Sequence, residues 1–139
     1  ESRFNIYNES EANLLGVAFT GTGIMTSAPY KVIDADHWVF NGAGVQNGDV
    51  FGEASLHMRV PGGASGHETD KITASSPDNV ELVAKGMNID DGGAENPVHE
   101  PGKGGMVFSA GSITYPASIL VDDVISRMTS NVISRFLTQ

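Results

Sequence analysis

Glycine and proline are so frequent in this chain that few segments are long enough for a regular helix. The 139 residues include 17 glycines and 6 prolines, spread over most of the length. Glycine weakens helices and proline lacks a backbone donor. Their frequent occurrence along the chain therefore favours short strands joined by turns. The stretch 117–137 contains neither residue. The sequence therefore predicts a body of short strands followed by one C-terminal helix.

The predicted C-terminal helix has the apolar pattern of an amphipathic segment. Its apolar residues recur at steps of three and four, which places them on one face. They are Leu120, Val121, Val124, Ile125, Met128, Val132 and Phe136. Pro116 suits a first helical turn, Asp122 lies near the positive end of the helix dipole, and Asp123 and Arg127 form an i,i+4 pair. We predict a helix over 117–137 that packs against a sheet.

The rest of the chain divides into apolar runs and one long polar stretch. Buried strands are expected at three apolar runs, namely 14–20, 82–85 and 106–110. Residues 53–60 alternate loosely, as a half-buried strand does. Residues 88–105 contain almost no large apolar side chain and predict a surface loop. The expected fold class is α/β, a mixed sheet of short strands covered by the C-terminal helix. Residues 1–139 would form a single domain or the C-terminal piece of a larger catalytic domain.

Charge and composition exclude several classes of function. Eight Lys and Arg residues against 17 Asp and Glu residues give a net charge of −9, which repels a phosphate backbone and argues against nucleic acid as a partner. The longest apolar run, 14–19, is far shorter than the roughly 20 residues of a membrane-spanning helix. With no cysteine, the chain has no disulfide and no thiolate metal site. No secretory signal is visible, and we expect a cytoplasmic location.

Several stretches invite comparison with known functional loops, and each lacks a required feature. Residues 21–23 read Gly-Thr-Gly, but position 26 is Thr where a dinucleotide loop needs its third glycine. Ser65 lies among glycines without the GxSxG spacing of a hydrolase nucleophile, and it is only a minor candidate. The acidic turns 34–37 and 90–93 could offer oxygen ligands to calcium but lack EF-hand spacing. No two histidines have the i,i+4 spacing of a helical zinc site.

The segment 63–71 concentrates the most chemistry in the fewest residues. It reads Gly-Ala-Ser-Gly-His-Glu-Thr-Asp-Lys, so flexible backbone precedes an imidazole, two carboxylates and an ammonium. In an extended segment Glu68 and Asp70 face one way while His67 faces the other. A carboxylate beside glycines can approach a small ligand closely, and partial burial would tune it for proton transfer. The alternative is a polar turn held by local hydrogen bonds.

Longer residue strings, in order along 14–139, carry a family resemblance. They are Leu15-Gly-Val-Ala-Phe-Thr-Gly-Thr-Gly23, Ser27-Ala-Pro-Tyr30, the segment 63–71, Ser75-Ser-Pro-Asp-Asn-Val-Glu-Leu-Val-Ala-Lys-Gly86, Asn88-Ile-Asp-Asp-Gly-Gly-Ala-Glu95 and Val107-Phe-Ser-Ala-Gly-Ser-Ile-Thr-Tyr-Pro-Ala-Ser118. With these strings the chain resembles the C-terminal region of the large (beta) subunit of N,N-dimethylformamidase and its relatives.

The resemblance implies a fold, an activity and partners. The family's large subunit is several times longer than this chain, its catalytic region looks like a glutamine-amidotransferase-type α/β fold, and it assembles with a small subunit. Its members hydrolyse an N-substituted formamide to formate and an amine. They use one iron, held by two tyrosines and a glutamate, which would polarise the carbonyl or its bound water. We therefore expect an iron-dependent amide hydrolase whose partners are the rest of the large subunit, a small subunit and a small amide substrate.

The same resemblance assigns roles within this chain. The iron-binding residues of the family lie upstream of the matched segment, and no motif maps them onto Tyr7, Tyr30 or Tyr115, so no metal ligand is expected here. Glu68 is the candidate catalytic carboxylate, which would carry a proton or bind the substrate water. His67 and Asp70 would position it or stabilise the fold.

Two other functions remain open from the sequence. One is a binding or interaction module that keeps the fold without catalysis, suggested by the small size of the chain and by its polar stretch 88–105. The other is a glycosidase that pairs Glu68 with Glu53 or Asp70, since such enzymes use two carboxylates at a defined separation.

Overall fold

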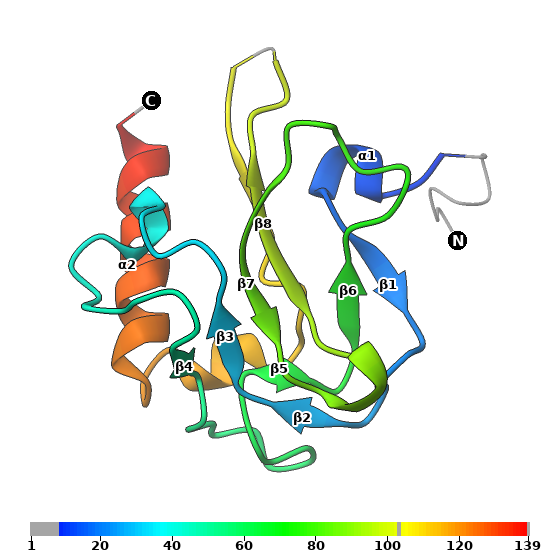
Figure 1. The fold of residues 1–139 in the computed structure, drawn as a ribbon, viewed down its shortest axis with the longest axis vertical. Coiled ribbons are helices and arrows are strands. Elements are labelled where there is room, and N and C mark those ends of the chain that lie inside the picture. Colours follow the sequence, from blue (N-terminus) through cyan, green and yellow to red (C-terminus); the bar gives the residue numbers. More distant parts are fainter. Residues whose placement is uncertain (1–8, 103, 139) are drawn as a thin grey trace.

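A five-stranded antiparallel sheet organises the molecule. The computed structural model describes residues 9–102 and 104–138 (Figure 1). The order of strands in this sheet is β4-β3-β7-β8-β9. Their bounds are β3 Tyr30–Val32, β4 Val50–Phe51, β7 Glu81–Gly86, β8 Glu95–His99 and β9 Val107–Phe108.

Two short strand pairs extend from this sheet. In the first pair, β1 (Ala18–Thr20) is antiparallel to β6 (Thr69–Lys71). In the second pair, β2 (Ser27–Ala28) is antiparallel to β5 (Ser65–Gly66). The segment 63–71 therefore contributes one strand to each pair and joins the two.

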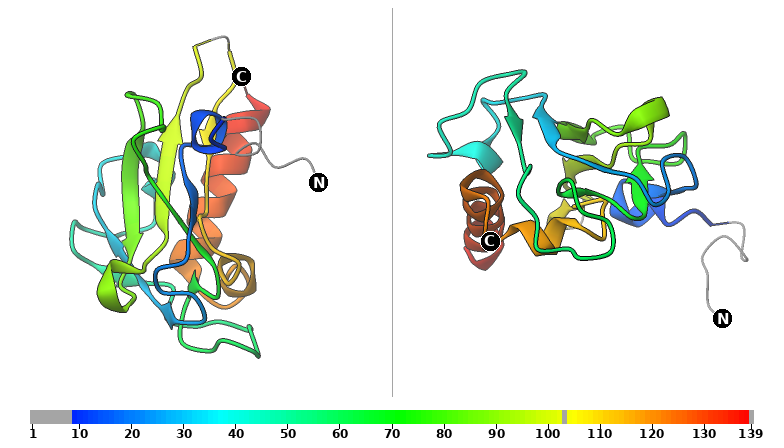
Figure 2. Two further views of the ribbon diagram at one scale, coloured as in Figure 1. Left: turned by 90° about the vertical axis from the view of Figure 1, so that its right-hand side faces the viewer. Right: turned by 90° about the horizontal axis from the view of Figure 1, so that it is seen from below.

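One long helix and four short helical segments complete the fold of the described residues. The long helix α2 (Asp123–Leu137) lies on the side of the molecule opposite to α1 (Ala12–Leu15), with the sheet between them (Figures 1 and 2). The 3₁₀ segments are η2 Trp38–Phe40, η3 Ile89–Asp91 and η4 Tyr115–Ser118. The helix α2 packs against η2 and η4.

Large apolar side chains fill the space between α2 and the sheet. Ile125 and Met128 of α2 are fully buried there, as is Tyr30 of β3. The Tyr30 ring stacks on Phe51, with ring centroids 5.6 Å apart, and meets Tyr115 edge-on at 6.3 Å. Aromatic pairs of this geometry stabilise a core beyond the area that they bury.

The start of α2 is fixed by one carboxylate. Asp122 caps the helix, since its Oδ1 accepts a hydrogen bond from the Ile125 amide at 3.0 Å. Its Oδ2 accepts a second hydrogen bond from the Gly52 amide at 2.8 Å. The helix is thereby attached to the chain that follows β4.

The structure confirms the expected combination of short strands with one C-terminal helix, and it corrects several details. All strand pairs among the described residues are antiparallel, where a mixed sheet was expected. The predicted helix over 117–137 begins only at Asp123, because η4 and the capping carboxylate precede it. The strand predicted at 82–85 is part of β7. The run 106–110 forms only the short strand β9.

Three other predictions are wrong in larger part. The run 14–20 is divided, with α1 ending at Leu15, Gly16 in a left-handed turn and β1 beginning at Ala18. Residues 53–60 form no strand. The stretch 88–105, predicted as a surface loop, contains η3 and the buried strand β8, whose five residues are all buried.

Candidate functional site

Glycines allow the segment 63–71 to lie directly against neighbouring backbone. A side chain at Gly63 would collide with the carbonyl group of Ala28, and one at Gly66 would collide with the carbonyl oxygen of Thr26. Both contacts are with backbone, which cannot turn aside as a flexible side chain does. The glycines of the motif are therefore required by close packing, independently of any ligand.

Ser65 is a structural residue in this packing. Its side chain is fully buried, and its hydroxyl donates to Asn88 Oδ1 at 2.7 Å while accepting from the Ala94 amide at 2.9 Å. Asn88 in turn donates from Nδ2 to the Ser65 carbonyl at 3.0 Å and to Thr26 Oγ1 at 2.9 Å. With its hydrogen bonds used in this way, Ser65 has the environment of a buried structural hydroxyl.

Of the two acids of the motif, Asp70 lies within β6 and Glu68 lies in the bend just before it. Glu68 is exposed, and its carboxylate forms no hydrogen bond or ion pair with the part of the chain that the structure describes. Asp70 is partly buried, and burial, together with the negative charges of Glu11 and Glu68, raises the pKa of its carboxyl above the ordinary value. The two carboxylates are close enough to influence each other and differ in environment, as an acid and base pair requires.

His67 lies in the short connection between β5 and β6, with a backbone geometry that is rare outside glycine. Its φ is 68°, in the left-handed region. Its amide donates to the Thr26 carbonyl and its own carbonyl accepts from the Met25 amide, so both backbone groups hold the turn. Its ring meets that of His57 edge-on, with centroids 5.5 Å apart, and its Nδ1 is buried with no hydrogen-bond partner among the described residues.

Thr69, on the opposite side of β6, is buried, and beside it lies an ion-pair network around the exposed carboxylate of Asp91, which no sequence pattern indicated. The Thr69 hydroxyl donates to the Gly92 carbonyl at 2.8 Å. Lys71 and Lys85 share the carboxylate of Asp91, with N–O distances of 3.4 and 2.7 Å. Lys85 also pairs with Glu95 at 3.3 Å, and this pairing explains how an acidic residue can lie in a buried strand. Because the network joins residues from four separate segments, no local spacing could have revealed it.

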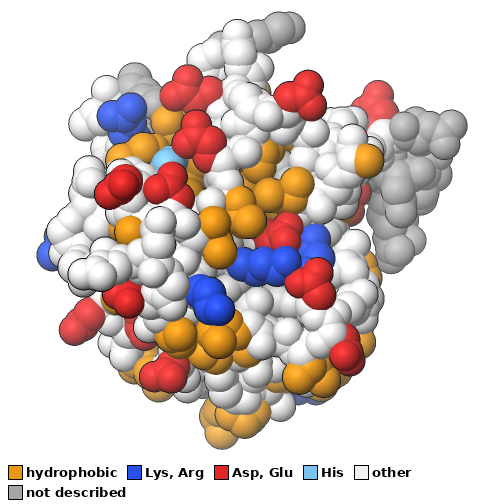
Figure 3. Space-filling view, viewed as in Figure 1, with side chains coloured by type: hydrophobic (Ala, Val, Ile, Leu, Met, Phe, Trp, Pro, Cys, Tyr) orange, Lys and Arg blue, Asp and Glu red, His pale blue; other side chains and the backbone are white. Residues whose placement is uncertain are grey.

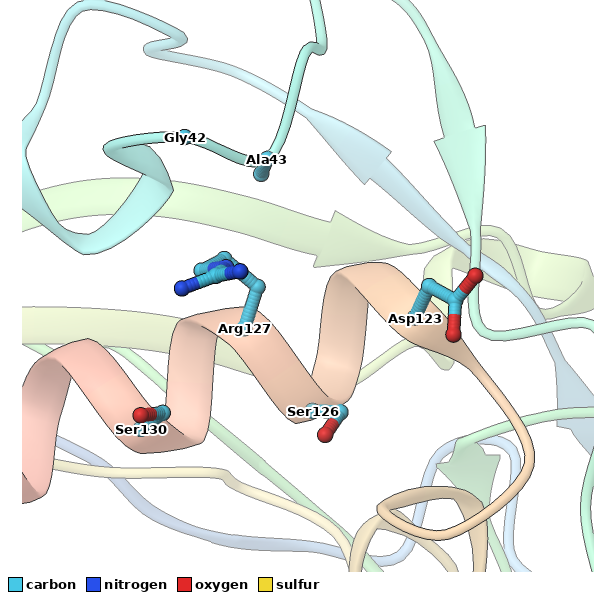
Figure 4. Close-up of a pocket in the computed structure, with 6 residues that line it drawn as sticks. All are labelled: Gly42, Ala43, Asp123, Ser126, Arg127 and Ser130. Atoms are coloured by element: carbon cyan, nitrogen blue, oxygen red, sulfur yellow. The ribbon is translucent and has the colours of Figure 1, made fainter.

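Two hollows of the described surface lie away from the predicted site residues. A hollow of about 420 Å³ lies between α2 and the turn at Gly42 and Ala43. Figure 4 shows Arg127 extending from α2 toward that turn, while the Asp123 carboxylate points elsewhere, and the two form no ion pair. A smaller hollow of about 150 Å³ includes His37, whose Nε2 lies 3.2 Å from Glu81 Oε2. Neither is lined by Glu68, His67 or Asp70.

The tyrosines that the structure describes do not suit an iron site. Tyr30 is fully buried and donates to the Ala110 carbonyl at 3.0 Å, and burial raises the pKa of its hydroxyl well above the ordinary value. Tyr115 is buried against Thr129, and burial raises its pKa to about 12. A tyrosinate ligand needs the opposite environment, one that favours the charged form. Tyr7 lies outside the described residues.

Two features are absent from the described residues, 9–102 and 104–138. No three His, Asp or Glu side chains of this part are grouped so that they could hold a metal ion. No helix of this part has both the length and the apolar character needed to cross a membrane.

Comparison with known proteins places the chain in a family. Residues 2–127 match the family described as N,N-dimethylformamidase beta subunit-like, C-terminal. The match includes the segment 63–71, the whole five-stranded sheet and the first residues of α2. No curated protein matches the chain. Since the matched residues make up most of its length, the chain belongs to the N,N-dimethylformamidase beta subunit-like, C-terminal family.

Proposed function

We propose that this chain is the C-terminal part of an amide hydrolase that resembles N,N-dimethylformamidase and converts an N-substituted formamide to formate and an amine. The observation that carries the proposal is the family match over residues 2–127. The chain would act together with the rest of a large subunit and with a small subunit. The iron that the resemblance implies would be held by residues outside this chain, in line with the buried, hydrogen-bonded tyrosines described above.

Within this proposal Glu68 supplies a carboxylate to the active site. Its exposure leaves the carboxylate available to a neighbouring segment or to substrate. There it would accept a proton from the water that attacks the amide carbon, the role of a general base. Asp70, two residues along the chain, would help to orient Glu68 or stabilise the fold from its partly buried place in β6, where burial above all, and then the charges of Glu11 and Glu68, raise the pKa of its carboxyl. His67 would fix the turn that carries both acids, because its backbone groups bond to the turn that precedes β2.

The test is formate release by the whole protein from a panel of N-substituted formamides. We expect Glu68→Gln to lower turnover at least about hundredfold, the lower range for loss of a general base. Iron content should be unchanged. The matched control is Glu100→Gln, which changes an exposed glutamate on the hairpin between β8 and β9.

The possible outcomes distinguish an error in the role of Glu68 from an error in the proposed activity. Normal turnover in Glu68→Gln would remove Glu68 from the mechanism and leave the amidase activity intact. No formate from any formamide, with iron bound, would contradict the activity itself.

A non-catalytic binding role is the second candidate, and the exposed apolar side chains favour it. Large apolar side chains are exposed in the segments that precede β2 and β5. Among them are Met25 (58% exposed), Leu56 (59%) and Met58 (95%). Figure 3 shows apolar side chains gathered at this end of the molecule. Exposed apolar patches mark interaction surfaces. A binding module should fold alone and bind its partner without iron, so failure to fold alone would count against it.

A further inference from the structure

The chain contains two Asn-Gly pairs, Asn41-Gly42 and Asn47-Gly48, and the fold treats them differently. All other asparagines are followed by larger residues. An asparagine before glycine is the arrangement in which the next backbone nitrogen can most easily reach the side-chain amide, because glycine has no Cβ to obstruct the approach. Both pairs lie in exposed turns, and a Cβ at either glycine would meet no atom within 4 Å.

The reacting atoms of the second pair are held by hydrogen bonds. The Gly48 amide donates to the Val32 carbonyl at 2.9 Å. The Asn47 side chain accepts from the Ala35 amide through Oδ1 at 2.6 Å. Both groups would have to leave these partners before the nitrogen could approach the side-chain carbon.

The reacting atoms of the first pair are free. Among the described residues, neither the Gly42 amide nor the Asn41 side chain has a hydrogen-bond partner. The backbone groups of Asn41 itself are both hydrogen-bonded. Its amide donates to the Trp38 carbonyl, and its carbonyl accepts from Asn131 Nδ2 at 2.9 Å. The Asn131 bond and the hydrogen bond from the Ala43 amide to the Phe40 carbonyl, at 2.9 Å, therefore both restrain the rotation that brings Gly42 N to the side chain.

We propose that Asn41 is a site of spontaneous deamidation, and that the fold protects Asn47 from the same reaction. Hydroxide removes the proton of the Gly42 amide, and the nitrogen attacks Cγ of Asn41. A C–N bond forms to close a succinimide, and the side-chain nitrogen leaves as ammonia. Water then opens either carbonyl of the ring, giving aspartate or, through the other carbonyl, isoaspartate.

The product would change the contact between η2 and α2. Asn41 lines a surface hollow together with Trp38, Asn131 and Arg135, and the Arg135 guanidinium lies 5.7 Å from the centre of the Trp38 ring. A new carboxylate there would be drawn to Arg135. Isoaspartate would also lengthen the backbone by one carbon at the end of η2, moving the carbonyl that Asn131 holds.

The test is a time course of the intact protein at mildly alkaline pH, with peptide mass spectrometry and isoaspartate detection at both sites. We expect Asn41 to react at least about fivefold faster than Asn47, the factor that corresponds to one hydrogen bond. In concentrated urea the two rates should become equal. In the variant Asn41→Gln the deamidation signal assigned to position 41 should disappear. Asn131→Ala should increase the rate of deamidation at Asn41, because it releases the Asn41 carbonyl.

Two results would overturn the proposal. One is a native rate at Asn47 equal to or above that at Asn41. The other is an unchanged ratio of rates in urea, which would show that the neighbouring sequence, and not the hydrogen bonding of the fold, decides between the two sites.

Discussion

Around α2 the molecule is packed by large side chains, whereas around β2, β5 and the start of β8 it is packed by residues with almost no side chain. Met128, Ile125 and Tyr30 fill the first region. In the second, Gly86 and Gly93 bring backbone against backbone, and the remaining space is taken by small polar side chains such as Ser65. We therefore expect the stability of the first region to fall when side-chain atoms are removed. The stability of the second region should fall when side-chain atoms are added.

The largest effect is expected from adding one methyl group to the glycine region. A Cβ at Gly93 would collide with the carbonyl of Gly86, and neither backbone can move without disturbing the pairing of β7 and β8. We expect Gly93→Ala to lower the free energy of unfolding by more than about 4 kcal/mol, above the usual range for overpacking. Urea denaturation measures this effect.

A matched glycine lies in open space. A Cβ added at Gly21 would have no atom within 4 Å, and the backbone there is not left-handed. Gly21→Ala should change stability by less than about 0.5 kcal/mol. Equal effects of the two substitutions would contradict the packing argument.

The next effect is expected from removing a large side chain near α2. Met128 is fully buried, so Met128→Ala should cost about 3 kcal/mol through lost burial and a residual cavity. Ser130→Ala, on the exposed face of the same helix, is the control and should be nearly neutral. Thermal or urea unfolding distinguishes them, and a small effect at position 128 would show that the core can collapse around the gap.

A smaller effect is expected where polar groups hold the glycine region. Asn88→Ala removes the partners of Ser65 and Thr26, leaving buried groups unsatisfied, and should cost about 2 kcal/mol. The control, Asn79→Ala, breaks one exposed bond to the Glu100 carbonyl and should cost less than about 0.5 kcal/mol. If Asn88→Ala were as mild as its control, water would have to satisfy the groups left behind.

The smallest expected change in stability is that of Asp70→Asn, which should stabilise the protein, whereas the substitutions above destabilise it. Because the folded state raises its pKa, ionised Asp70 disfavours folding at neutral pH, and protonation removes that penalty as the pH falls. Asp70→Asn should therefore raise the urea midpoint at pH 7. The difference should disappear below the ordinary pKa of 3.8.

Asp78→Asn, on an exposed turn, serves as the control for this pH dependence. A stabilisation by Asp70→Asn that persists unchanged at low pH would show that the charge is not its cause.

The helix and β7 could be predicted because their signals are local. Apolar spacing within 117–137 marks one face of α2, and the run 82–85 marks a buried strand. The start of the helix could not be placed, because the Asp122 carboxylate also binds the Gly52 amide, far away in sequence.

Strand β8 was missed because its residues are polar and their partners are distant. Glu95 accepts from the Ile72 amide and pairs with Lys85, and Asn96 donates to the Ala110 carbonyl at 2.6 Å. Pro97 lacks a backbone donor and interrupts the expected strand pattern. Composition alone therefore predicted a surface loop where the fold has a buried strand.

For the candidate site, sequence reasoning singled out the segment 63–71 and could not describe its surroundings. The segment 63–71 does combine tight packing with accessible acids, as its glycines and charges indicated. The fixed role of Ser65 depends on Asn88 and Ala94, and the raised pKa of Asp70 depends partly on Glu11. Contacts across such sequence separations leave no local pattern.

The double hydrogen bonding of Asp122 has a consequence for the order of folding. Its two oxygens join amides that lie 3 and 70 residues away, so completing the first turn of α2 coincides with closing a long chain loop. Loop closure carries an entropic penalty that local helix formation does not. The most local element of the molecule is thus tied to one of its most distant contacts, and the amides of Gly52 and Ile125 should exchange their hydrogens in a single cooperative opening.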